Sequence, residues 1–145
     1  MRRRFSRLLA GYQPEELFAL VADIEAYPDF IPFCREARVI RRDGEVLRVV
    51  NVFGLGPLRL RFTSEAVLAA PRALTISSQD ALWRRFEMRW RFDPEAGGCR
   101  LSCDMALEFS SAMLEALSPL AGPELETQVM QAFERRAKKL FGERL

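Results

Sequence analysis

The stretch Leu82–Phe109, LWRRFEMRWRFDPEAGGCRLSCDMALEF, decides the fold because apolar and charged residues alternate along both of its arms. Strict alternation predicts a half-buried strand, since successive side chains of a strand point to opposite faces. Gly97-Gly98 separates the arms and predicts a tight turn. The expected inward face of the first arm is Leu82, Phe86, Met88, Trp90 and Phe92, and that of the second is Cys99, Leu101, Cys103, Met105, Leu107 and Phe109.

Shorter strands with turn residues between them precede this hairpin. Asp43-Gly44 is a strong hairpin signal, and Pro71 ends the longest of these strands. That strand is expected to bury Leu58, Leu60, Phe62 and Leu68. The predicted strands are Phe5–Ala10, Val39–Arg42, Val46–Phe53, Leu58–Leu68 and Leu74–Ser77.

Two helical regions flank the strands. Gln13-Pro14-Glu15-Glu16 begins a short helix, which stops before Tyr27-Pro28 and buries Leu17, Phe18, Leu20, Val21 and Ile24. Ser110 or Ser111 is a natural N-cap for the C-terminal helical part, and Pro119 and Pro123 predict a kink or break near Gly122. The long helix, Glu124 to Leu140, presents one apolar stripe: Leu125, Val129, Phe133, Ala137 and Leu140.

These elements predict one α+β domain over residues 1–145. Successive antiparallel strands with one wet face form a curved sheet of about seven strands, and the long C-terminal helix packs into its concave side. In this arrangement the curved sheet is expected to wrap around the helix and grip it. The space between sheet and helix is expected to stay partly open as a ligand cavity.

Composition excludes several classes of function. The chain has no histidine, which removes histidine-assisted nucleophiles and histidine-bound zinc, and it has no phosphate-binding glycine loop. Its three cysteines lack metal-ligand spacing, and two of them fall on the apolar face of a strand. We therefore expect no catalytic residues, no metal, no required cofactor and no enzymatic activity.

Charge and hydropathy indicate the cellular setting. The net charge of +2 argues against a DNA-binding protein, although almost all the cations are arginine. No apolar run approaches the ~20 residues that span a bilayer. The start, Met1-Arg2-Arg3-Arg4-Phe5, lacks the apolar core of an export signal and is interpreted as part of the first strand. A cytoplasmic protein is expected, with peripheral, transient contact at the inner membrane surface as an option.

The most distinctive stretch is Tyr27-Pro28-Asp29-Phe30-Ile31-Pro32-Phe33-Cys34, which combines three aromatic residues with two prolines. Each proline restricts the backbone, so the stretch predicts a stiff apolar loop. It is explained equally by a plug that seals the core and by a lid over a ligand.

This stretch is similar to the signature of the coenzyme Q-binding and polyketide cyclase-like branch of the START (helix-grip) superfamily, which includes RatA-type ribosome association toxins. Three further segments resemble that branch in order, so the resemblance covers nearly the whole chain. Phe33 stands where the family commonly has tryptophan, and Phe141 where tyrosine is usual. The three segments are Leu82–Phe92, Leu107–Ser111 and Met130–Ala137.

The resemblance implies non-enzymatic binding of a hydrophobic ligand, ubiquinone or a polyprenylated precursor, in support of respiration. It also implies a helix-grip fold of the START/Bet v 1-like kind and one alternative function, a toxin that binds the large ribosomal subunit and blocks subunit association. A polyketide cyclase-like enzyme is the less favoured alternative, because such an enzyme needs titratable residues inside and the alternation places almost none there. The predicted ligand-binding residues are Tyr27, Phe30, Phe33, Phe62, Phe86, Met88, Trp90, Met105, Leu107, Val129, Met130 and Phe133.

Outward-facing arginines are the candidate RNA contacts for the ribosome-binding alternative. The same residues are also explained as ordinary charges that keep a wet sheet face soluble. The candidates are Arg59, Arg61, Arg85, Arg89 and Arg91.

Overall fold

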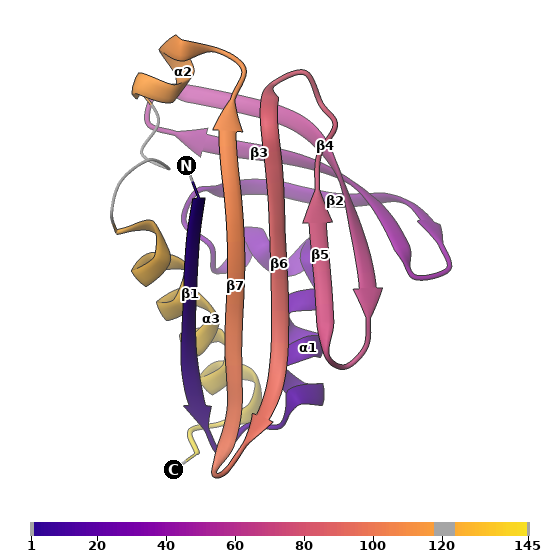
Figure 1. The fold of residues 1–145 in the computed structure, drawn as a ribbon, viewed down its shortest axis with the longest axis vertical. Coiled ribbons are helices and arrows are strands. Elements are labelled where there is room, and N and C mark those ends of the chain that lie inside the picture. Colours follow the sequence, from indigo (N-terminus) through magenta and orange to yellow (C-terminus); the bar gives the residue numbers. More distant parts are fainter. Residues whose placement is uncertain (1, 118–123, 145) are drawn as a thin grey trace.

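Seven antiparallel strands form one sheet, and helices α1 and α3 lie against the same face of it (Figure 1). The computed structural model describes residues 2–117 and 124–144. The strand order is β1-β7-β6-β5-β4-β3-β2, so β1 and β2 are the edges. The predicted α+β helix-grip fold is thereby confirmed. The elements are β1 (Arg2–Ala10), α1 (Pro14–Ala22), the 3-10 helix η1 (Ile24–Asp29), β2 (Cys34–Asp43), β3 (Val46–Leu55), β4 (Leu58–Ala69), β5 (Ala73–Ser77), β6 (Trp83–Glu95), β7 (Gly98–Phe109), α2 (Ala112–Leu117) and α3 (Leu125–Phe141).

The β6–β7 hairpin forms as its alternation predicts, with one local difference. Phe86 pairs with Leu107 and Trp90 with Cys103, so the expected inward residues of both strands meet on one face. The pairing register shifts between Trp83 and Arg85, and the extra residue reverses the side-chain phase before Phe86. Trp83, at 5% exposed, is therefore the inward residue, and the prediction that Leu82 belongs to the strand is wrong.

The β2–β3 hairpin turns at Gly44, as expected, and Gly44 has a φ of 61° that favours glycine. Irregular register between Cys34 and Glu36, and again between Val39 and Arg41, marks bulges in the edge strand β2. Bulges bend a strand and increase its twist, which suits a sheet that curves around a helix.

Helix α3 buries an apolar stripe that follows an i, i+4 series. Phe141 continues this series after Ala137 and packs on Tyr12, with 6.4 Å between the ring centroids. The prediction that Leu140 is buried is wrong, because it is 49% exposed. Steps of four residues rotate slowly around a 3.6-residue helix, so the buried stripe follows the twisted sheet and leaves Leu140 outside. The buried residues are Leu125, Val129, Met130, Ala132, Phe133 and Ala137.

Ion pairs join α3 to strand β1 beside it. Arg3 lies 2.7 Å from Glu126 and Arg7 lies 3.2 Å from Glu134. The predicted break near Gly122, together with Pro119 and Pro123, lies outside the described residues. Among the described residues, no helix is both long and apolar enough to cross a bilayer.

The segment before β2 differs in detail from the expected loop. Helix α1 begins at Pro14, where the Gln13 backbone N–H donates to Glu16 Oε1 at 3.0 Å. After α1, η1 includes Tyr27 and Pro28, so the first part of the aromatic stretch is helical. This places Tyr27 toward α3 and leaves Phe33 to lead into β2.

Candidate functional site

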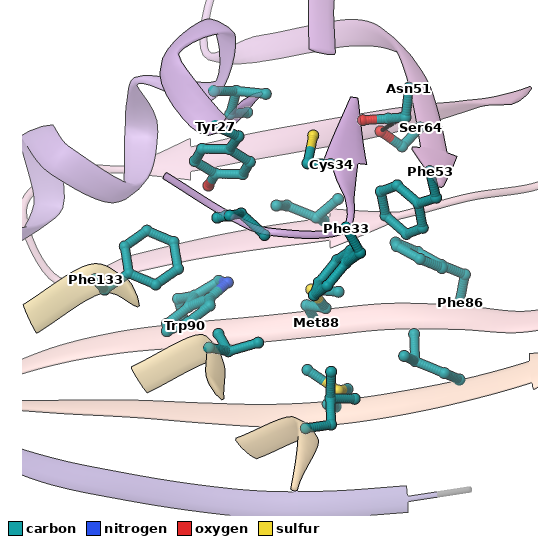
Figure 2. Close-up of a pocket in the computed structure, with 17 residues that line it drawn as sticks. Tyr27, Phe33, Cys34, Asn51, Phe53, Ser64, Phe86, Met88, Trp90 and Phe133 are labelled. Carbon is teal, nitrogen blue, oxygen red and sulfur yellow. Dashed lines mark hydrogen bonds between the residues drawn. The ribbon is translucent and has the colours of Figure 1, made fainter. Parts of the chain in front are cut away.

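An apolar pocket lies between the concave face of the sheet, η1 with the loop after it, and α3 (Figure 2). Strands β3 to β7 supply its floor, and α3 supplies one wall. The lining residues are Ile24, Tyr27, Ile31, Phe33, Cys34, Asn51, Phe53, Ser64, Ile76, Phe86, Met88, Trp90, Met105, Leu107, Leu125, Val129 and Phe133.

The free space inside the pocket is small. Its volume is about 60 Å³. An apolar cavity of about 150 Å³ holds one benzene molecule, so a substituted ring with a tail does not fit without movement of the walls. The structure is therefore the closed form of any ligand site at this position.

Two polar side chains face the pocket from neighbouring strands. Asn51 on β3 is 8% exposed and Ser64 on β4 is 6% exposed. Asn51 Nδ2 donates to Ser64 Oγ at 2.9 Å and lies 3.4 Å from the carbonyl oxygen of Phe62. This pair is a polar spot in a lining that is otherwise dominated by aromatic and aliphatic groups.

Two lining residues can titrate, and burial keeps both neutral. Burial raises the pKa of the Cys34 thiol to about 11 and raises the pKa of the Tyr27 hydroxyl well above its ordinary range. The Tyr27 hydroxyl donates to the carbonyl oxygen of Val21 and is thus committed to the fold. No carboxylate or cationic side chain is among the lining residues of the described chain, so the pocket offers no acid–base pair.

Nine of the twelve predicted ligand-binding residues line this pocket, and three do not. Phe62, 1% exposed, lies among Phe53, Trp83 and Phe86 in the solid core. Met130 is buried and is not among the lining residues, and Phe30 packs edge-to-face on Phe133 without lining the pocket. The nine lining residues are Tyr27, Phe33, Phe86, Met88, Trp90, Met105, Leu107, Val129 and Phe133.

Sequence reasoning missed the polar pair and several apolar lining residues. Asn51 is the chain's one asparagine, and it sits at an inward position between Val49 and Phe53. A polar residue inside an alternating apolar series is a usable signal for a site. Besides Asn51 and Ser64, the missed lining residues are Ile24, Ile31, Cys34, Phe53, Ile76 and Leu125.

A ring of aromatic contacts closes the pocket between η1 and α3. Phe133 lies 5.2 Å from Phe30 and 5.8 Å from Tyr27, measured between ring centroids. Arg136 stacks over Phe30 at 5.2 Å and lies 4.0 Å from Asp29. These contacts are made by side chains alone, so η1 and α3 can separate without breaking a strand pair.

The five predicted RNA-contacting arginines are all exposed, but they form two groups. Strand β5 lies between β4, which carries Arg59 and Arg61, and β6, which carries the other three. On β6, Arg89 pairs with Glu87 at 2.6 Å and Arg91 with Asp93 at 3.7 Å, while Arg85 has no ion pair with a described residue.

The β4 arginines lie beside two arginines of β2. The pairing register places Arg38, Val50 and Thr63 in one row of the outward face, and Glu36, Val52 and Arg61 in the next. Arg35 lies across Gly54, where an added Cβ would meet its Nε at 2.6 Å. Within the described chain no acidic side chain pairs with any of the four, and we call them the arginine face: Arg35, Arg38, Arg59 and Arg61.

The described residues contain no group of three or more histidine, cysteine, aspartate or glutamate side chains placed to hold a metal ion. All three cysteines are buried and free. A curved sheet, a gripping helix and an apolar pocket with one polar spot define the class of helix-grip proteins.

The chain belongs to the family described as polyketide cyclase / dehydrase and lipid transport, whose model matches residues 10–134. This confirms the resemblance to the START superfamily branch. The chain is 30% identical over 142 residues to the coenzyme Q-binding protein coq10, mitochondrial, of Schizosaccharomyces pombe, covering 93% of this chain and 85% of that one. It is 29% identical over 137 residues to the ribosome association toxin RatA of Vibrio cholerae, covering 93% and 94%.

Solved structures share the fold. The 18 kDa protein CC1736 of Caulobacter crescentus is 28% identical, with a TM-score of 0.75 over 98% of this chain and 99% of that one. A START superfamily protein of Mycobacterium smegmatis is 18% identical, with a TM-score of 0.69 over 97% of both chains. The Zhui aromatase/cyclase of Streptomyces sp. R1128 is 13% identical, with a TM-score of 0.71 over 96% and 95%. The last two likenesses concern the fold alone.

Proposed function

We propose that this protein binds a hydrophobic ligand without catalysis, and that the ligand is ubiquinone or a polyprenylated precursor used in respiration. The observation that carries the proposal is the pocket, lined almost throughout by apolar side chains and held between the sheet and α3. Tyr27, whose neutral hydroxyl is hydrogen-bonded to Val21, and the neutral Cys34 supply no acid–base chemistry. The coenzyme Q-binding relative supports a quinone as the ligand.

The small closed volume determines how a ligand enters. The wall formed by η1, the loop to Phe33 and α3 is joined by ring contacts, whereas the floor is joined by backbone hydrogen bonds. Separating η1 from α3 costs the ring contacts and the Arg136–Asp29 pair, whereas the backbone at Phe33 is held to β3 by a hydrogen bond from the Gly54 N–H at 2.9 Å. We infer a lid in which the side chains of Tyr27, Phe30 and Phe33 move relative to Phe133. We also infer that the protein is cytoplasmic and contacts a membrane surface transiently to exchange its ligand.

Organic extraction and mass spectrometry of the protein purified from its native host test the proposal. We expect a polyprenyl quinone or its phenolic precursor in amounts comparable to the protein. A Val129→Phe variant adds a ring to the void and is expected to lose the ligand. Leu140→Phe, on the exposed side of the same helix, is the matched control.

An extract free of isoprenoid compounds, from a protein that also fails to bind added quinone, would contradict the proposal. Loss of ligand from both helix variants would also count against it, because Leu140 does not touch the pocket.

The arginine face favours a second candidate, binding to the large ribosomal subunit in the manner named for the RatA relative. Four outward arginines that form no ion pair with a described residue make a local cationic surface despite the low net charge, although Glu36 lies in the row of Arg61. Each arginine that neutralises a phosphate releases a counterion, so such binding weakens steeply with salt.

Sucrose-gradient sedimentation tests this candidate. We expect co-migration with the large subunit at low salt that is lost in Arg59→Gln/Arg61→Gln. The ion-paired Arg89→Gln/Arg91→Gln double variant is the control and is expected to co-migrate. Failure of the unmodified protein to co-migrate at low salt leaves the arginine face with a solubilising role.

A further inference from the structure

The orientation of the Asn51 amide is determined by its neighbours. One terminal atom lies 3.4 Å from the carbonyl oxygen of Phe62, 3.5 Å from that of Val49 and 2.9 Å from Ser64 Oγ. Two of these neighbours can only accept hydrogen bonds, so the atom facing them is the donor Nδ2. Asn51 Oδ1 is consequently the atom left for the pocket.

The pair presents one free acceptor and one free donor to the pocket. Among the described residues no donor reaches Asn51 Oδ1, and the Ser64 hydroxyl, which accepts from Asn51, donates to no described acceptor. Both side chains are more than nine-tenths buried. Figure 2 shows their oxygens next to each other on the side that faces Cys34.

We propose that Asn51 and Ser64 recognise a ring hydroxyl on the ligand, so that the pocket prefers a hydroquinone or phenol to the corresponding quinone. This rests on the proposed function and names the chemical form of its ligand. A hydroxyl donates to Asn51 Oδ1 and accepts from the Ser64 hydroxyl at the same time. A quinone carbonyl accepts from Ser64 but leaves Asn51 Oδ1 without a donor.

The preference follows from the cost of burying that acceptor. Once a ligand excludes water, an acceptor without a donor loses its hydrogen bonds to water and gains none to the ligand, which weakens binding. The indole N–H of Trp90 also lines the pocket without a described partner, but an N–H donates equally well to a carbonyl and to a hydroxyl. Discrimination between the two redox forms therefore depends on Asn51.

Equilibrium dialysis under anaerobic conditions tests this with three probes that share one decyl chain: the hydroquinone, the quinone and the hydroquinone dimethyl ether. We expect the hydroquinone to bind about tenfold more tightly than the quinone, as for one buried acceptor left without a donor. The dimethyl ether, which cannot donate, should bind no better than the quinone.

Asn51→Leu is expected to reduce the hydroquinone-to-quinone ratio to about one while keeping quinone binding. Ser64→Ala should weaken both forms, and Ser102→Ala, on the outward side of β7, is the matched serine control that leaves all three affinities unchanged. Equal binding of all probes by the unmodified protein, or a preference that survives in Asn51→Leu, would overturn the proposal. No binding of any probe would instead overturn the proposed function.

Discussion

Two aromatic clusters on the same concave face are built in different ways. The closed cluster, Phe62, Trp83 and Phe109, comes from strands β4, β6 and β7, and Trp83 stacks on Phe109 with 4.3 Å between centroids. The pocket cluster, Tyr27, Phe30, Trp90 and Phe133, comes from η1, the loop after it, β6 and α3.

The difference lies in what holds the rings in place. Strands of the closed cluster belong to one hydrogen-bonded sheet, so its rings cannot separate without disrupting strand pairing. The pocket cluster joins separate elements through ring contacts, and the void lies beside it. The closed cluster therefore stabilises the fold, and the pocket cluster is the part that can open.

The largest expected effect is in the closed cluster. Phe62→Ala removes a ring that is 1% exposed and should lower the free energy of unfolding by about 3–5 kcal/mol. Chemical denaturation measures this loss. Quinone affinity of the folded protein should stay within about twofold, because Phe62 does not line the pocket. A loss of quinone affinity with little loss of stability would contradict this and show that Phe62 contributes to the ligand site.

The second effect concerns thiols in both regions. Burial raises the pKa of Cys34, at the pocket, and of Cys99, in the solid core, to about 11. Above about pH 9 the unfolded chain loses these protons while the folded chain keeps them, so stability should fall as pH rises from about 9 to 11. Each thiol contributes at most about 1.4 kcal/mol per pH unit.

Urea denaturation at neutral pH and at several values in this window measures the slope. Cys34→Ala and Cys99→Ala should each flatten the fall in stability relative to the unmodified protein. A bound ligand should reduce the labelling of Cys34 by a thiol reagent and leave Cys99 unaffected. Identical pH profiles for the variants and the unmodified protein would show that these thiols do not titrate differently on folding.

Much of this arrangement follows from local pattern. Alternation in Leu58–Leu68 and in Leu82–Phe109 predicts the strands, their inward faces and the curved sheet, because burial depends on a period of two. The bulge at Arg84 could not be predicted, since an extra residue leaves the composition of the strand unchanged. Because of this bulge, Trp83 takes the inward position that the alternation predicts for Leu82.

The site was less predictable than the fold because it depends on register between strands. Asn51 and Ser64 become a pair only when β3 and β4 align, and the arginine face exists only because β2 lies beside β3. Phe62 and Phe86 share the inward phase of their strands, yet one is sealed in the core and the other faces the void. The alternation along a strand determines which face of the sheet a side chain occupies. It does not determine whether that side chain lies in the solid core or at the pocket.

The smallest expected effect separates two rings of the lid. Phe33 lines the pocket and packs on Phe53 at 5.2 Å, whereas Phe30 packs on Phe133 and beneath Arg136. Stacking a quinone ring on an aromatic side chain contributes about 0.5–1.5 kcal/mol beyond area burial, by analogy with aromatic pairs. Phe33→Ala should therefore weaken quinone retention several-fold. Phe30→Ala should weaken it less, by loosening Phe133 rather than by losing a ligand contact.

Bound quinone and melting temperature, measured on the same samples, distinguish a lid from a core plug. Phe141→Ala is the matched control, because this ring is also partly buried but packs on Tyr12 away from the pocket. If Phe33 is a lid residue, its truncation lowers quinone occupancy in the folded fraction with a stability loss no larger than that of the control. A large loss of stability with unchanged quinone occupancy would show that Phe33 is a core residue. Phe33 would then belong with the closed cluster, and Tyr27 would remain in the pocket cluster.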